Sequence, residues 1–267
     1  MEWQAPALVL SAAPYGESAL VVHVLAEAEG SYRGLVRGGV SRRQAGLWQP
    51  GNLVQARWFA RLSEQLGTLS GELVFPTASR VLDHALPLGL LASACALADA
   101  ALPEREPHPL IFAGLLRLLT SLGLDPAAAG RSGPAMLIRW EADLLAELGF
   151  GLDLSACALS GQTTGLSFVS PRTGRAVAEA ASGAWRDRLL PLPRLLLDSA
   201  DAGTAAEWAA GLRLTGHFLA RDAFGQRHRP LPAARLRLLE SIEREVDKEG
   251  QGAALDPLGP QAPGPRG

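Results

Sequence analysis

The chain has 267 residues, of which 48% are hydrophobic and 19% are charged, and its formal net charge is -2. So large an apolar fraction excludes an extended disordered protein, and the length suffices for one large domain or a few small ones. The longest uncharged apolar stretch, residues 85–98, is shorter than the roughly 20 residues that cross a bilayer, and no secretion signal opens the chain, so we expect a cytoplasmic protein without a membrane span.

The first 80 residues contain short apolar and β-branched runs separated by turn signals, which predict a β-domain. Strands are expected at Ala7–Ala12, Ser18–Leu25, Ser31–Arg37, Leu53–Ala60 and Leu66–Val74. In the fourth run, Trp58 lies on the face predicted to be buried, while Arg57 and Phe59 lie on the opposite face. Five strands in about 75 residues favour an OB-fold barrel, with an SH3-like barrel as the alternative.

After Pro76 the apolar pattern becomes helical, so the whole chain is predicted to be α+β. Helices are expected at Pro87–Leu102, Leu110–Leu122, Pro134–Leu148, from Thr204 onward, and at Pro232–Lys248. Thr204 and Glu207 have the spacing of a capping box, which supports a helix start there.

The helical domain is expected to comprise residues 81–150 and 195–249, with an insert between its two parts. Residues 151–194 are rich in Gly, Ser, Thr and Pro, which predicts an irregular or short-strand insert. Residues 250–267 lack any periodicity, and we expect them to form a disordered tail.

Charge is concentrated between Ser31 and Arg61, where six arginines occur without one acidic residue. These residues are Arg33, Arg37, Arg42, Arg43, Arg57 and Arg61. Trp48 and Phe59 accompany them, and a basic surface with aromatic platforms is typical of proteins that bind single-stranded nucleic acid. The alternative is that the aromatic rings cover the barrel end while the arginines are merely solvated. Arg213, His217 and Arg221 share one predicted helical face and form a weaker second candidate.

The motifs of several enzyme classes are missing from the sequence. No phosphate-binding loop of the GxxxxGK[ST] type exists, because the one lysine is Lys248. Asp83 with His84, and Cys157 alone, are weak candidates for catalysis. The sequence therefore predicts a binding protein rather than an enzyme, and its two cysteines predict no disulfide framework.

Several stretches together resemble the bacterial RecO family of DNA repair and recombination mediators over almost the full length. They are ALVLSAAPYGESALVVHVLAE, GLVRGGVSRR, WQPGN, LPEREPHPLIF, RWEADLLAELGFGLDLSAC, FVSPRTGRAV and DRLLPLP. The resemblance implies an N-terminal OB-fold, a helical domain and a zinc-ribbon-like insert. It also implies binding of single- and double-stranded DNA, strand annealing, and loading of RecA together with RecR and the single-strand-binding protein, in the cytoplasm at the nucleoid.

Two further expectations follow from this resemblance. Many family members hold zinc with two CxxC pairs in the insert, but here Cys157 is followed by Ser160, and Ala178 and Ala181 stand about where the second pair belongs. One thiolate cannot hold a structural zinc, so we expect no metal and an insert shaped by turns and apolar contacts.

The family also implies a site for the acidic, apolar C-terminal tail of the single-strand-binding protein. Such a tail ends in a carboxylate, which favours apolar walls beside an arginine. Arg139 and Trp140 are the candidates, although Arg139 could instead pair with Asp143 one turn further on. Two other hypotheses remain: a protein adaptor whose barrel binds a partner rather than DNA, and a hydrolase or transferase that uses the weak catalytic candidates.

Overall fold

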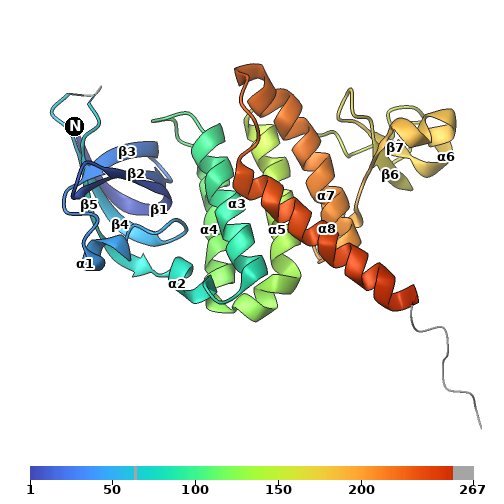
Figure 1. Cartoon of the computed structure of the whole chain (residues 1–267). Coiled ribbons are helices and arrows are strands. Elements are labelled where there is room, and N and C mark those ends of the chain that lie inside the picture. Colours follow the sequence, from blue (N-terminus) through green and yellow to red (C-terminus); the bar gives the residue numbers. More distant parts are fainter. Residues whose placement is uncertain (63–64, 255–267) are drawn as a thin grey trace, which may run out of the picture.

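The computed structural model describes residues 1–62 and 65–254 (Figure 1). A β-barrel lies at one end, a group of helices occupies the middle, and a small strand-containing insert lies at the other end (Figure 1). The fold is α+β, as the sequence predicts.

Five strands close the N-terminal, OB-like barrel in the order β1-β2-β3-β5-β4. They are β1 (Glu2–Tyr15), β2 (Ala19–Ala26), β3 (Gly30–Val36), β4 (Leu53–Phe59) and β5 (Thr68–Phe75). Neighbouring strands pair antiparallel except β3 and β5, which pair in parallel. All five predicted strands are confirmed, although β1 is longer than its apolar run suggested.

Aromatic rings fill part of the barrel interior. The ring centroid of Tyr32 lies 5.3 Å from that of Trp3 and 4.9 Å from that of Trp58, both in edge-to-face arrangements. The indole of Trp58 donates a hydrogen bond to the carbonyl of Arg33 at 2.9 Å. Gly67 has a φ of +68°, and a Cβ there would lie 2.5 Å from the Trp58 ring, so only glycine fits this close approach.

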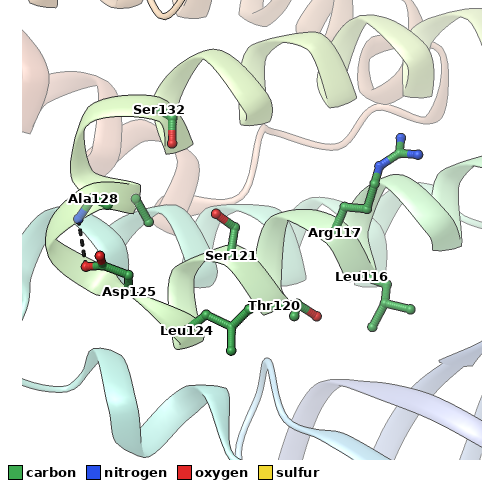
Figure 2. Close-up of a pocket in the computed structure, with 9 residues that line it drawn as sticks. Leu116, Arg117, Thr120, Ser121, Leu124, Asp125, Ala128 and Ser132 are labelled. Carbon is green, nitrogen blue, oxygen red and sulfur yellow. Dashed lines mark hydrogen bonds between the residues drawn. The ribbon is translucent and has the colours of Figure 1, made fainter.

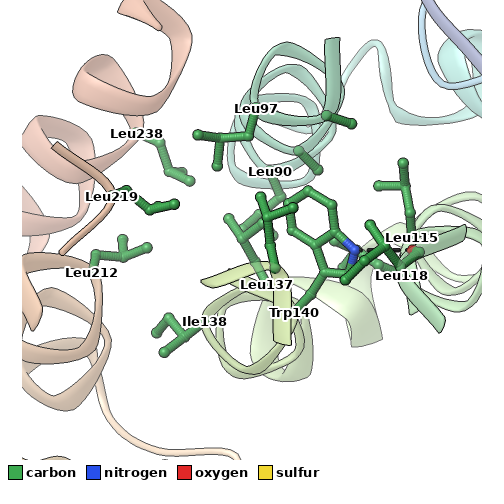
Figure 3. Close-up of a cluster of buried hydrophobic side chains, with 14 of the residues drawn as sticks. Leu90, Leu97, Leu115, Leu118, Leu137, Ile138, Trp140, Leu212, Leu219 and Leu238 are labelled. Carbon is green, nitrogen blue, oxygen red and sulfur yellow. Dashed lines mark hydrogen bonds between the residues drawn. The ribbon is translucent and has the colours of Figure 1, made fainter. Parts of the chain in front are cut away.

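Six α-helices form the middle of the molecule. They are α2 (Thr77–Val81), α3 (Ala85–Ala101), α4 (Pro109–Leu124), α5 (Pro126–Glu147), α7 (Ala205–Phe218) and α8 (Ala233–Ala254). Leucines from these helices converge in one core, among them Leu90, Leu115, Leu137, Leu212 and Leu238, all at most 3% exposed (Figure 3).

Two helix boundaries differ from the prediction. Helix α5 begins at Pro126 rather than Pro134, because the Asp125 carboxylate caps it by accepting a hydrogen bond from the Ala128 amide at 2.9 Å. Helix α8 continues to Ala254, so the first five residues of the predicted tail are helical, and residues 255–267 lie outside the described residues. The capping box of Thr204 and Glu207 is confirmed.

The insert contains a three-stranded sheet in the order β7-β6-β8, as the prediction of short strands allowed. Its elements are β6 (Leu166–Val169), β7 (Ala176–Ala178), α6 (Glu179–Ser182), the 3₁₀ turn η1 (Gly183–Arg188) and β8 (Leu190–Pro191). The chain returns to the helices through the 3₁₀ turn η2 (Arg194–Leu196). Further on, α7 continues into the short π-helix η3 (Leu219–Phe224) and the 3₁₀ turn η4 (Gly225–Arg227).

A buried ion pair joins three of the helices. The Arg235 guanidinium on α8 donates to both carboxylate oxygens of Glu141 on α5, and the Thr215 hydroxyl on α7 donates to the same carboxylate. These three side chains are at most 1% exposed. Removing one partner of such a pair leaves an unpaired buried charge, so loss of either Arg235 or Glu141 should be strongly destabilising.

Candidate nucleic-acid interface

The outer face of β3, β5 and β4 gathers three of the predicted contact residues. Arg57 and Phe59 point outward from β4, opposite Ser70 and Thr68 of β5, and Arg37 follows the end of β3. Together these five side chains line a shallow hollow of about 350 Å³. Phe59 is 48% exposed, so the prediction that it lies on the solvent face is confirmed.

The arginines of this face differ in their partners. Arg57 forms an ion pair with Glu2 of β1, and the Arg33 Nε lies 3.1 Å from the Glu104 carboxylate, with both arginine side chains at least half exposed. Among the described residues, Arg37 forms no ion pair. Arg61, just past β4, is exposed. Exposed ion pairs contribute little stability, so a polyanion can compete for these guanidinium groups.

The segment between β3 and β4 contains a short helix that carries two of the predicted contact residues. Arg42 and Arg43 begin the one-turn helix α1 (Arg42–Ala45). The Arg42 side chain is exposed. The Arg43 side chain lies outside the described residues, so its place at the interface stays a prediction.

Trp48 cannot serve as a stacking platform, and this part of the sequence prediction is wrong. Its side chain is 1% exposed and belongs to the barrel core. The indole nitrogen donates to the Gln44 side chain at 3.0 Å, which ties the ring to α1. Because α1 turns the loop back toward the barrel, a tryptophan that the sequence places in a loop becomes a core residue.

The basic face of α7 is occupied by contacts within the protein. Arg213 pairs with Glu243 at 2.7 Å, and the His217 Nε2 lies 3.1 Å from the Pro171 carbonyl. Arg221 also donates to the Pro171 carbonyl and pairs with Asp222. The predicted face therefore holds the turn of the insert at residues 170–175 against the helices.

Arg139 and Trp140 do not form the predicted site for a peptide carboxylate. Trp140 is 2% exposed, and its indole donates to the Ile111 carbonyl at 3.1 Å. The Arg139 guanidinium donates to the carbonyls of Leu195, Asp198 and Asp201, so its expected pairing with Asp143 is also wrong. This arginine fixes the segment that follows the insert onto α5.

A hollow between α4 and α5 combines apolar walls with an arginine, the composition expected of a site for a peptide carboxylate. It has a volume of about 430 Å³, and its walls include Leu116, Leu124 and Ala128. Figure 2 shows Arg117 at one end and Asp125 at the other. The Asp125 carboxylate is engaged in capping α5, whereas Arg117 is exposed. Arg117 stands among the leucines of α4, a local pattern that is visible in the sequence.

Two buried residues, Ser31 and His23, and the half-buried Asp99 have the connectivity of a hydrolase triad at the junction between barrel and helices. The Ser31 hydroxyl contacts His23 Nε2, and His23 Nδ1 contacts the Asp99 carboxylate of α3. Burial alone would raise the pKa of Asp99, but the hydrogen bond and charge of His23, the Ser11 hydroxyl and Arg33 outweigh it and lower this pKa. Ser31 is 0% exposed, so no substrate reaches its hydroxyl and the three residues join the two domains.

The structure does not bring the weak catalytic candidates Asp83, His84 and Cys157 together in a catalytic arrangement. Asp83 and His84 are exposed beside the start of α3, and no hydrogen bond joins their side chains in the described part of the chain. Cys157 is 2% exposed, and its sulfur accepts hydrogen bonds from the amides of Ala178 at 3.2 Å and Ser160 at 3.4 Å. The amide of Ala178, followed by Ser160, lowers the pKa of the thiol to about 6.

The donor set of the insert does not fit a structural zinc. Cys157 is the sole sulfur there, and the described residues contain no cluster of three or more His, Cys, Asp or Glu side chains that could hold a metal. Instead Cys157, Val177 and Ala178 form a small buried cluster against Leu166 and Phe168. The insert holds its shape by these apolar contacts and by its turns.

Comparisons with known proteins agree with this architecture. The profile for Recombination protein O N terminal matches residues 1–76, and that for Recombination protein O C terminal matches residues 86–231. The chain is 62% identical over 243 residues to the DNA repair protein RecO of Gluconacetobacter diazotrophicus, covering 91% of this chain and 96% of that protein. It is 54% identical over 254 residues to the same-named protein of Granulibacter bethesdensis, covering 95% and 100%. Across the described residues, every helix is too short or too polar to cross a membrane.

Proposed function

The chain belongs to the RecO family of DNA repair and recombination proteins, and from this premise we propose that it is a recombination mediator without catalytic activity. It binds single- and double-stranded DNA, anneals complementary strands, and helps RecR load RecA onto strands coated by the single-strand-binding protein. This activity takes place in the cytoplasm, at the nucleoid.

The observation that carries the DNA-binding part is the hollow on the outer face of the barrel. Arg37 and Arg57 flank an exposed Phe59, with the hydroxyls of Thr68 and Ser70 beside them. Guanidinium groups bind phosphates through several donors, while a ring accepts any base by stacking. This combination suits a strand of any sequence, as an annealing protein requires.

The same proposal places the tail of the single-strand-binding protein in the hollow between α4 and α5. Leu116 and Leu124 offer apolar walls, and Arg117 offers a guanidinium for the terminal carboxylate. Replacing Arg117 with Ala should weaken binding of the tail peptide in a calorimetric titration. Arg131→Ala, which changes another exposed arginine on α5, is the matched control and should leave the affinity unchanged. Equal peptide affinity in the two variants would remove the tail from this hollow.

The DNA interface is tested by fluorescence anisotropy with a labelled single strand at several salt concentrations. Each lost phosphate contact should flatten the slope of log affinity against log salt by roughly 0.7 for single strands. The double variant Arg37→Ala, Arg42→Ala should therefore flatten it by about 1.4. Arg237→Ala on the remote helix α8 is the control, with no change expected.

A protein adaptor is the alternative, and one observation favours it. Glu2 and Glu104 already pair with Arg57 and Arg33, which reduces the positive charge of the barrel face. An adaptor would bind no single strand, or would bind it with the same salt slope in the parent, the double variant and the control. Such a result would replace the DNA-binding proposal with the adaptor hypothesis.

A further inference from the structure

The insert exposes a tryptophan, in contrast to the rest of the molecule. Trp185 in η1 is 59% exposed, the largest exposed fraction among the six tryptophans of the chain. Four others, Trp3, Trp48, Trp58 and Trp140, are at most 9% exposed, and Trp208 is half-buried. An exposed indole of this size is typical of a surface that a partner covers.

Arginines stack on the aromatic rings around this position. The Arg188 guanidinium lies 5.6 Å from the centroid of the Trp185 ring, and that of Arg186 lies 5.3 Å from the centroid of Phe168. Arg186 also pairs with Glu179, whereas Arg188 forms no ion pair with any described residue. A stacked guanidinium keeps its edge donors free, so it can bind a phosphate while its face contacts the ring.

The charge distribution makes the insert the second basic end of an elongated molecule. Residues 151–194 contain five arginines and three acidic residues, a net charge of +2, and residues 1–80 have a net charge of +1. The rest of the chain has a net charge of -5. The barrel and the insert lie at opposite ends, with the helices between them (Figure 1). A polyanion is therefore attracted at the two ends and repelled by the middle.

We propose that Trp185, Arg186 and Arg188 form a second contact for single-stranded nucleic acid, here called the insert surface. This proposal rests on the proposed DNA-binding function and adds a second site to it. A base stacks on the exposed indole, and the two arginines bind the adjoining phosphates. The ring is sequence-tolerant, because every base has a π-face.

Two separated contacts on one protein have a consequence that depends on strand length. A strand that reaches both ends binds its second contact intramolecularly, which raises its overall affinity above that of either contact alone. A strand of about 10 nucleotides, within the range that one OB-fold covers, engages a single contact. Loss of the insert surface should therefore weaken the binding of long strands more than that of short strands.

The fluorescence of the unlabelled protein provides the first measurement. Because Trp185 is the exposed indole, stacking of a base should quench and shift its emission, whereas the four buried indoles report little. We expect quenching by an oligothymidylate strand in the parent and none in Trp185→Phe. Quenching that persists in Trp185→Phe, or is missing in the parent despite binding by anisotropy, would overturn the insert surface.

Affinity for long and short strands provides the second measurement. Trp185→Ala should weaken binding of a long strand by at least about 5-fold, the lower end of the effect of one stacked base. Trp185→Phe retains a ring and should bind the long strand nearly as the parent does. An unchanged affinity in Trp185→Ala would overturn the proposal and leave a protein partner as the explanation for the exposed ring.

The barrel variants separate this proposal from the proposed function. If Arg37→Ala, Arg42→Ala flattens the salt slope while Trp185→Ala changes nothing, the barrel binds DNA and the insert surface does not. If the parent binds no strand at all at low salt, both proposals fail. If the barrel variant has no effect while Trp185→Ala weakens binding, the insert surface is correct and the barrel assignment is wrong.

Discussion

The barrel buries its tryptophans, whereas the insert exposes its single tryptophan to solvent. The closed barrel encloses Trp3, Trp48 and Trp58, whereas the insert's own buried cluster consists of Cys157, Val177 and Ala178 and contains no buried aromatic ring. A closed sheet has an interior that can hold indoles, while an open sheet of this size does not. An aromatic residue of the barrel therefore belongs to the core unless its side chain points outward, as that of Phe59 does. The insert has no such interior, and Trp185 is exposed to solvent.

The largest expected effect is a loss of folding stability when an aromatic ring is removed from the barrel core. Trp58→Ala should lower the free energy of unfolding by about 3–5 kcal/mol, because it removes a buried ring and the hydrogen bond from its indole to the Arg33 carbonyl. Trp185→Ala is the matched control on the insert and should change stability by less than about 0.5 kcal/mol. Urea denaturation followed by circular dichroism measures both. Similar losses in the two variants would contradict the contrast between a closed core and an open surface.

The next effect concerns DNA binding by the exposed ring of Phe59 on the outside of the barrel. Phe59→Ala should weaken single-strand binding by about 1–3 kcal/mol per stacked base while leaving the salt slope unchanged, because no phosphate contact is lost. Val74→Ala removes another exposed apolar side chain of the barrel, 54% exposed and outside the hollow, and should have no effect. A flattened slope in Phe59→Ala would mean that the ring positions Arg57 rather than a base.

A smaller effect on folding stability, which depends on pH, is expected at the junction between the barrel and the helices. The pKa of Asp99 is lowered below its ordinary value of 3.8, so its stabilising contribution is full above that pH and is lost as the pH falls through the lower pKa. Asp99→Asn should therefore reduce stability by about 1–2 kcal/mol near neutral pH, a range that allows for the solvent exposure of the carboxylate. The difference from the parent should vanish at low pH. A difference independent of pH would show that packing, not charge, determines the role of Asp99.

Local patterns in the sequence predicted most of the fold, since alternation and capping depend on neighbouring residues. The five strands, the outward direction of Phe59 and the capping box of Thr204 are of this kind. The errors concern contacts between distant segments. Trp48 is buried because α1 folds back, and the partners of Arg139 are carbonyls at residues 195–201. The pair of Glu141 and Arg235, which are 94 residues apart, has no local signal at all.

The smallest effect concerns the insert, where Cys157 is buried in a small apolar cluster. The amide of Ala178 and the nearby Ser160 lower the pKa of Cys157 to about 6 from an ordinary 9.0, so the folded insert holds a thiolate at neutral pH. The resulting stabilisation is complete above the ordinary pKa and is lost as the pH falls through about 6. Protection of the Ala178 amide against hydrogen exchange should follow this titration, relative to amides of the barrel core.

Cys157→Ser tests whether the thiolate or the apolar cluster holds the insert together. A hydroxyl still accepts a hydrogen bond but does not ionise in this range, so the variant should fold and lose the pH dependence of Ala178 protection. The ultraviolet absorbance of the thiolate, which should titrate near pH 6 in the parent, provides the independent measurement. Cys95 serves as an internal control, because burial raises the pKa of its thiol to about 12 and removes it from this range. An unchanged pH profile in Cys157→Ser would assign the shape of the insert to Val177, Leu166 and Phe168 alone.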